Sequence, residues 1–190
     1  MQSQLISPFA VLQALEETLL RDAKGLPLHE TSAQNWVGVS FLSGSHVLLT
    51  PLDEVLEIMR VPVLAPLPGV KTWLRGMVTS HGELFPVTDL NGFISGKVSA
   101  LTHYSRILVI KSEEDTSGML VDRVLGLQRI DFEKKSKIVA NQSADITPFI
   151  IGSFTNEGLD LPIISCKAIM KHPKFRDVAQ REDEKAEEKE

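Results

Sequence analysis

Acid–base chemistry is the reaction type for which this sequence offers the most suggestive residues. His81, Glu83 and Asp89 lie close together along the chain, and an imidazole beside carboxylates can move protons as a general acid or base. His81-Gly82 is nevertheless typical of a hairpin turn, where a histidine is usually a solvated residue. The sequence contains no glycine-rich phosphate loop, nucleophile elbow or helical His-Glu-x-x-His pattern. We therefore predict that the protein is not an enzyme and has no catalytic residues.

Metal and thiol chemistry have equally little support. The five histidines are spread singly through the chain, and none lies at metal-ligand spacing from another histidine or from the single cysteine, Cys166. The apolar neighbours Ile163, Ile164 and Ile169 favour a buried structural cysteine over a reactive thiolate. A single cysteine excludes an intrachain disulfide and fits a reducing compartment. We expect no cofactor and no metal.

The balance of charge favours protein partners. The chain of 190 residues carries 20 Lys and Arg against 25 Asp and Glu, a formal net charge of -5, and such a field repels nucleic-acid phosphates. No stretch approaches the ~18 uninterrupted apolar residues of a membrane-spanning helix. The first residues also lack the basic region of a signal peptide. We predict a cytoplasmic protein that binds no nucleic acid and does not insert into a membrane.

The two ends of the chain differ from its middle. Near the amino terminus, Pro8 suits a first helical turn, apolar residues recur at helical spacing, and Gly25 ends the pattern, which predicts an amphipathic helix over residues 7–24. With the linker that follows, this helix forms the first predicted unit, residues 1–35. Residues 173–190 end in a charged run whose only apolar residue is Ala186, so we predict a solvated, disordered tail there.

Between these ends, short apolar and β-branched runs separated by turn residues predict β-strands. The first set of strands is expected at residues 36–42, 47–50, 55–61, 76–80 and 83–88, and the second at 107–111, 119–121, 124–130, 149–155 and 159–164. Their regular spacing indicates compact barrels or sandwiches rather than a parallel α/β sheet. A short helix over residues 165–171 follows the last strand. The fold class is therefore mainly β.

The two sets of strands match each other in register. Residues 76–87 align without gaps on residues 152–163, sharing two glycines, a threonine and a proline. Residues 52–61 align in the same order on residues 121–130, and two matches in one order favour an internal duplication over chance. We expect one barrel from residues 36–95 and another from residues 105–165, within a domain that spans residues 36–172. Because a lone β-domain of this size buries only a modest core, we expect the two barrels to pack together.

A set of short motifs runs through both halves of the chain. They are Val55-Leu56-Glu57-Ile58, Leu67-Pro68-Gly69-Val70, Gly76-Met77-Val78, His81-Gly82 and Phe85-Pro86-Val87-Thr88-Asp89-Leu90 in the first half, and Gly118-Met119-Leu120-Val121-Asp122 and Ile151-Gly152 in the second. Together they resemble the CheW-like chemotaxis coupling protein family over roughly residues 36–170. Trp36 and the run from Leu67 to Trp73 further resemble the PilI-like branch of that family, which serves type IV pilus twitching motility.

The resemblance implies a fold and a function. The fold would be two SH3-like five-stranded β-barrels packed side by side, with an N-terminal helix and a C-terminal helix. The function would be that of a non-catalytic adaptor in chemotaxis-type signal transduction. It would couple the signalling tip of a methyl-accepting receptor to the regulatory domain of a histidine kinase, within membrane receptor arrays that control twitching motility. The alternative is a signalling regulator that binds a small ligand in the seam between the two barrels.

By motif position, the resemblance implies a partner-binding set drawn from both halves. Its members are Val55, Glu57, Ile58, Gly76, Val78, His81, Val121 and Val124. For each valine or isoleucine, simple burial in a barrel core is the competing interpretation. Members of the family usually carry an arginine that pairs with the position of Glu57, whereas this chain has His81 there, which predicts a weaker or pH-sensitive contact. Ser165 likewise stands opposite Asp89, where the family has an acidic residue, so the cap of the last helix is expected to differ.

Overall fold

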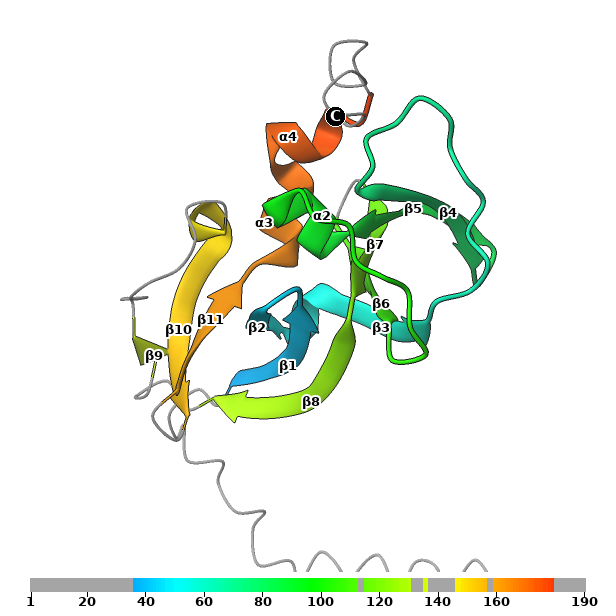
Figure 1. Cartoon of the computed structure of the whole chain (residues 1–190). Helices are drawn as coiled ribbons and strands as arrows, with labels where there is room; N and C mark the ends of the chain where they lie inside the picture. Colours follow the sequence, from blue (N-terminus) through cyan, green and yellow to red (C-terminus); the bar gives the residue numbers. More distant parts are fainter. Residues whose placement is uncertain (1–35, 113–114, 131–134, 137–145, 157–158, 180–190) are drawn as a thin grey trace, which may run out of the picture. The chain divides into compact units, whose positions relative to one another are not determined.

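The protein is mainly β in the computed structural model (Figure 1), which describes residues 36–112, 115–130, 135–136, 146–156 and 159–179. The predicted amino-terminal helix and linker, and the tail beyond residue 179, lie outside these residues. The strands are β1 Trp36–Ser43, β2 His46–Pro51, β3 Val55–Arg60, β4 Leu74–Ser80, β5 Glu83–Asp89, β6 Arg106–Lys111, β7 Thr116–Val121, β8 Arg123–Ile130, β9 Lys135–Ser136, β10 Ile150–Asn156 and β11 Leu159–Ile164. The helices are short: η1 Leu52–Glu54, α2 Leu90–Ser95, η3 Thr147–Phe149, α3 Cys166–Lys171 and α4 Pro173–Arg176. Each predicted strand overlaps one of these elements.

The strands form two sheets, one of five strands in the order β3-β6-β7-β5-β4 and one of six in the order β8-β1-β2-β11-β10-β9. Neighbours pair in antiparallel fashion except β5 with β7 and β11 with β2, which are parallel. The two edge strands of the five-stranded sheet, β3 and β4, are connected by the chain that follows β3. Beyond β3, Ala65 exchanges two backbone hydrogen bonds with Met77 of β4, at 2.9 and 2.8 Å. The chain that leaves one edge of this sheet therefore covers part of the other edge.

The sheets do not follow the two halves of the chain, so the expectation of one barrel from residues 36–95 and another from 105–165 is wrong in this respect. β1 and β2, from the first half, join β8, β10 and β11 of the second half, while β6 and β7 of the second half join β3, β4 and β5. Each sheet thus combines the first two strands of one copy with the later strands of the other, β3 to β5 in the five-stranded sheet and β8 to β11 in the six-stranded sheet. Because of this exchange, the chain passes from one sheet to the other twice, after β2 and after β7. Each copy therefore depends on the other to complete its sheet.

The internal duplication itself is confirmed by the strand registers. In the hairpin β4–β5, Met77 lies opposite Pro86, and in the hairpin β10–β11, Ser153 lies opposite Pro162, the equivalent pair of the alignment. Both hairpins carry an irregularity at the same place, between residues 74 and 76 in one and between 150 and 152 in the other. Irregularities at equivalent positions of the two hairpins agree with an internal duplication.

The apolar residues form a shared core and two smaller ones. In β6, Leu108 and Ile110 belong to the largest cluster, which also contains Val39 and Phe41 of β1, whereas Ile107 and Val109 belong to a second cluster within the five-stranded sheet. Both faces of β6 are therefore buried, which explains why its sequence is almost continuously apolar. A third cluster, of Leu49, Phe154 and Ile163, lies within the six-stranded sheet.

The C-terminal segment extends the shared core. Phe175 of α4 is 9% exposed, and its ring lies 5.9 Å from that of Trp73 and 5.5 Å from that of Phe93. Beyond α4, the backbone N–H of Lys71 donates to the carbonyl oxygen of Val178. The prediction of a disordered tail from residue 173 is therefore wrong for residues 173–179, because aromatic packing outweighs the charged character of the segment. No helix in the described parts of the chain has the length and hydropathy needed to cross a membrane.

Candidate partner-binding surface

Two equivalent strands present apolar side chains to solvent. β3 is an edge strand of the five-stranded sheet and exposes 62% of Leu56 and 39% of Ile58. β8 is the edge strand of the other sheet and exposes 50% of Leu125 and 60% of Leu127, which are the aligned positions of the second copy. Leu56 and Leu125 are also the residues skipped by the pairing registers with β6 and β1. Each bulge therefore turns the same leucine outward at a sheet edge.

Glu57 and His81 form the contact that the sequence suggested. The Nε2 atom of His81 lies 3.3 Å from Oε2 of Glu57, and the Ser80 hydroxyl donates to the same oxygen at 3.5 Å. The side chain of His81 is 83% exposed and that of Glu57 is 35% exposed. His81 sits in the β4–β5 turn with a positive φ of 49°, while Glu57 lies on β3. The pair therefore joins the two edge strands of the five-stranded sheet.

Gly76 allows the backbone pairing between Ala65 and Met77 and has no side chain to offer a partner. Its φ is +136°, and a Cβ atom on it would overlap the carbonyl oxygen of Ala65, the residue that bonds to Met77. A side chain here would push the chain beyond β3 away from β4. The position thus requires glycine for both its backbone conformation and the close approach of a neighbouring backbone.

The valines of the predicted site lie deeper. Val78 is 5% exposed in the core of the five-stranded sheet, and Val121 is 1% exposed in the shared core. Val55 and Val124 are half-buried and pack against that same shared core. Val78 and Val121 therefore shape the surface from beneath, because their side chains have almost no area to offer a partner. The exposed members of the predicted set are Glu57, Ile58 and His81.

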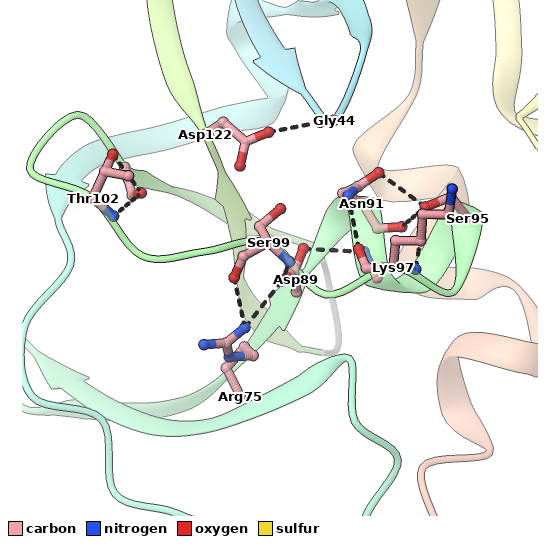
Figure 2. Close-up of polar contacts among 11 residues, drawn as sticks. Gly44, Arg75, Asp89, Asn91, Ser95, Lys97, Ser99, Thr102 and Asp122 are labelled. Carbon is pink, nitrogen blue, oxygen red and sulfur yellow. Dashed lines mark hydrogen bonds and ion pairs between the residues drawn. The ribbon is translucent and has the colours of Figure 1, made fainter. Parts of the chain in front are cut away.

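Asp89 has a structural environment and is far from forming an acid–base set with His81. Its carboxylate is fully buried and accepts hydrogen bonds from the backbone N–H groups of Gly92, at 3.0 Å, and Ser99, at 2.7 Å. Nη1 of Arg75 lies 3.2 Å from Oδ2 and also donates to the carbonyl oxygen of Ser99 (Figure 2). Asp89 thus caps α2 and fixes the chain that follows it.

The other two groups of the possible acid–base set are occupied elsewhere. His81 contacts Glu57, as described above, and Glu83 accepts a hydrogen bond from the Thr116 hydroxyl at 2.6 Å.

Cys166 is fully buried, and this burial raises the pKa of its thiol to about 12. The thiol is therefore held in its unreactive protonated form at neutral pH. Within the described residues, no three His, Cys, Asp or Glu side chains gather closely enough to hold a metal ion.

Sequence reasoning missed Leu56, Leu125 and Leu127 as surface residues, and it missed the helix α2. The leucines gave no clear signal in the sequence, because the exposed alternate positions of β3 and β8 are themselves apolar. The signal for α2 was Asp89 before a short apolar run and Gly96 after it, an N-cap and a left-handed C-cap. No element was predicted for residues 90–95, and the strands predicted at 55–61 and 124–130 were not assigned an exposed face.

A protein-family model describes most of the region discussed above. The model of the CheW-like domain matches residues 37–174. The chain belongs to the CheW-like domain family. Among curated relatives in this family, protein PilI of Pseudomonas aeruginosa is 34% identical over 177 residues, which cover 93% of this chain and 99% of PilI. Protein FrzA of Myxococcus xanthus is 34% identical over 90 residues, covering 47% of this chain and 56% of FrzA.

A solved structure of the CheW-like family supports the fold. The crystal structure of the scaffolding protein TtCheW from Thermoanaerobacter tengcongensis matches with a TM-score of 0.64 and 20% sequence identity, covering 73% of this chain and 89% of that one. The chemotaxis protein CheW of Thermotoga maritima is 26% identical over 92 residues, 48% of this chain and 60% of that protein. The shared fold therefore extends across most of the described residues.

Proposed function

We propose that this CheW-like protein is a non-catalytic adaptor of a chemotaxis-type signalling system that controls type IV pilus twitching motility. In this role it couples the signalling tip of a methyl-accepting receptor to the regulatory domain of a histidine kinase, in the cytoplasm beneath a membrane receptor array. The observation that carries the proposal is the alignment with PilI, which extends over 99% of that protein. The family model over residues 37–174 gives independent support.

The two edge strands offer the surfaces that an adaptor needs. Leu56 and Ile58 on β3, and Leu125 and Leu127 on β8, are exposed apolar pairs at equivalent positions of the duplicated unit. Exposed apolar residues on a sheet edge suit strand addition or the docking of an amphipathic helix. Two such surfaces on separate sheets allow one molecule to hold two partners at once. We also propose that each sheet is an SH3-like barrel, a geometry with which the Ala65–Met77 closure agrees.

The predicted binding residues take different parts in this proposal. Glu57, Ile58 and His81 are exposed enough to touch a partner, and Val55 and Val124 are available in part. Gly76, Val78 and Val121 act by holding β3, β4 and β7 in position. Contact alone does not transmit a signal. The adaptor changes kinase output only if its contacts differ in free energy between the two states of the assembly.

Calorimetric titration against two separate fragments tests the proposal. The full chain is titrated with the kinase regulatory domain and with a receptor signalling fragment from the organism's own twitching-motility system. The variants Leu56→Asp and Leu125→Asp place a charge on each edge strand, and Ile151→Asp is a matched control, because Ile151 is 45% exposed on β10. We expect the parent to bind both fragments and each edge-strand variant to lose one of them. Absence of binding by the folded parent to either fragment would contradict the adaptor function.

The alternative of a small ligand in the seam between the barrels has less support. The shared core contains Val39 and Phe41 from one sheet and Leu108 and Ile110 from the other, each fully buried. The junction is thus filled by apolar side chains at the positions where a seam ligand would have to sit.

A further inference from the structure

A cavity of about 420 Å³ lies at the ends of two paired strands. Arg60 and Val61 line it from the end of β3, and Arg106 lines it from the start of β6. The rest of the wall is the turn of residues 102–105 that precedes β6. The volume falls in the range of pockets that hold small molecules, which is about 300–1,000 Å³.

The two arginines of this cavity are directly opposed in the sheet. Arg60 pairs with Arg106 in the antiparallel register of β3 and β6. Directly opposed side chains have Cβ atoms about 5 Å apart, and like charges in that relationship repel each other. Neither arginine has a carboxylate within 4.0 Å among the described residues, since the ion pairs found there involve other cations. The arrangement therefore concentrates positive charge that no carboxylate of the described residues pairs with, in a chain whose net charge is negative.

The turn of residues 102–105 holds Arg106 in place. Nη1 of Arg106 donates to the carbonyl oxygens of His103, at 2.9 Å, and Ser105, at 2.8 Å, so one corner of the guanidinium is anchored to the backbone. The backbone N–H of Thr102 donates to the Ser105 hydroxyl at 2.9 Å, which closes the turn. The guanidinium carbon of Arg123, on β8, lies 4.0 Å from the centre of the Tyr104 ring and brings a third cation beside the cavity. The guanidinium of Arg106 is thus held in place before any ligand arrives.

The duplicated unit provides an internal comparison. The residue equivalent to Arg60 in the second copy is Arg129, which also lies on an edge strand. Arg129, however, pairs with Val37 of β1, so no second cation faces it. The fold therefore does not require two opposed arginines at this position, and their presence in the five-stranded sheet needs another explanation.

We propose that the cavity binds the phosphate group of a small phosphorylated ligand. Guanidinium groups present forked donors that match phosphate oxygens, and all the cations here are arginines rather than lysines. A phosphate group carries a charge of about −1.5 to −2 at neutral pH, which offsets the repulsion between Arg60 and Arg106 better than a single carboxylate would. The hydroxyls of Thr102 and Ser105 offer additional polar contacts on the same wall. Arg60 lies two residues beyond Ile58 on the exposed side of β3, but anion binding at this site does not depend on the proposed adaptor function.

Titration of the full chain with inorganic phosphate and with pyrophosphate, at constant ionic strength, tests this site. We expect saturable binding that weakens roughly tenfold or more in Arg60→Gln and in Arg106→Gln, because each variant removes a charge-assisted contact. Arg129→Gln is the matched control, since it removes the same charge at the equivalent position of the other sheet, and it is expected to bind as the parent does. Because Arg106 also anchors the turn, Arg60→Gln, which leaves the anchoring carbonyls untouched, keeps the test valid if Arg106→Gln is poorly folded.

Three results would overturn the proposal. The first is no saturable binding of either anion by the parent. The second is equal weakening in Arg129→Gln, which would indicate only a diffuse effect of net charge. The third concerns the source of the anion. An oligo-glutamate peptide serves as a probe for carboxylates of a protein partner. Arg60-dependent binding of this peptide without binding of phosphate would assign the cavity to an acidic polypeptide instead.

Discussion

Glu54 lies at the N-terminus of α3, where its two carboxylate oxygens accept hydrogen bonds from the Ser165 hydroxyl at 2.7 Å and from the backbone N–H of Lys167 at 2.9 Å. The Ser165 hydroxyl in turn accepts from the N–H of Ala168 at 3.1 Å. In the first copy, Asp89 alone caps the equivalent helix α2. In the second copy, a serine from the local sequence and a carboxylate from the segment before β3 share that task. The negative charge at the helix start is thus retained although Ser165 is neutral.

Replacing Glu54 by glutamine tests this shared cap. The amide keeps the shape of the side chain but loses the charge and one acceptor, so we expect the free energy of unfolding to fall by about 1 kcal/mol. Urea denaturation monitored by tryptophan fluorescence measures the change, and Asp53→Asn serves as the control because Asp53 is exposed beside it. Equal stability of the two variants would mean that the cap contributes nothing beyond the local charge.

The sequence allowed the strands and their duplication to be predicted, but not how the two copies combine. Alternating apolar runs and the shared glycines of residues 76–87 and 152–163 depend on local patterns, which a single chain reveals. Whether β1 pairs with β3 of its own copy or with β8 of the other copy depends on long-range contacts. Because the copies are similar, both pairings satisfy the same local pattern, and the choice between them leaves no trace in the sequence.

The candidate site was predictable in the same uneven way. The proximity of Glu57 and His81 followed from motif positions, and the structure has that contact. The burial of Val78 and Val121 could not be separated from exposure, because a valine on a strand suits either face until the packing is known. Leu56 faces solvent because of a bulge, and a bulge changes the direction of a side chain without changing the pattern of residues.

Alanine at Gly76 is expected to be far more damaging than alanine at Gly126. Both glycines have φ near +140°, with values of +136° and +142°, so both substitutions impose the same backbone strain. Only at Gly76 does the new Cβ overlap a backbone atom, the carbonyl oxygen of Ala65, whereas nothing lies near that of Gly126. We expect losses of about 1–2 kcal/mol in unfolding free energy for Gly126→Ala and at least about 3 kcal/mol for Gly76→Ala.

Chemical denaturation of both variants measures these losses under identical conditions. Amide hydrogen exchange of Ala65 and Met77 gives a local readout, because their mutual hydrogen bonds close the five-stranded sheet. We expect faster exchange at these two amides in Gly76→Ala and no change in Gly126→Ala. Similar stability of the two variants would show that backbone strain, and not the close approach of Ala65, explains the glycine.

Arginine in place of His81 is expected to tighten receptor binding. The guanidinium of arginine carries a permanent charge and forked donors that match a carboxylate. Opposite Glu57, whose Oε2 lies 3.3 Å from Nε2 of His81, arginine would form a fixed ion pair between β3 and the β4–β5 turn. On the proposed function, we expect His81→Arg to bind a receptor signalling fragment a few-fold more tightly than the parent, the effect of a surface ion pair. Calorimetric titrations of both proteins at one pH and one ionic strength measure the difference.

A second substitution separates the ion pair from a general effect of charge. Adding Glu57→Gln to the His81→Arg variant leaves the arginine without its carboxylate, so the advantage of arginine should disappear. If the arginine improves binding equally in both backgrounds, it acts on the receptor directly, and the Glu57 contact has no part in the effect.

Cys166 is expected to make the fold less stable in alkaline solution. Burial raises the pKa of its thiol from the ordinary 9.0 to about 12, so between these values the unfolded chain loses a proton that the folded chain keeps. The unfolded state therefore binds fewer protons, and the free energy of unfolding falls as the pH rises, by roughly 1.4 kcal/mol per pH unit from this group. Well below pH 9.0 the thiol is protonated in both states, and it contributes no slope.

Cys166→Ala lacks the ionising group, so urea denaturation from about pH 8 to about pH 11 should give it a shallower decline than the parent. All other ionisable groups are common to the two proteins, so only the difference between the two slopes reports on the thiol. Parallel slopes would mean that the thiol ionises in the folded chain as readily as in the unfolded one, and that water reaches the core beneath α3.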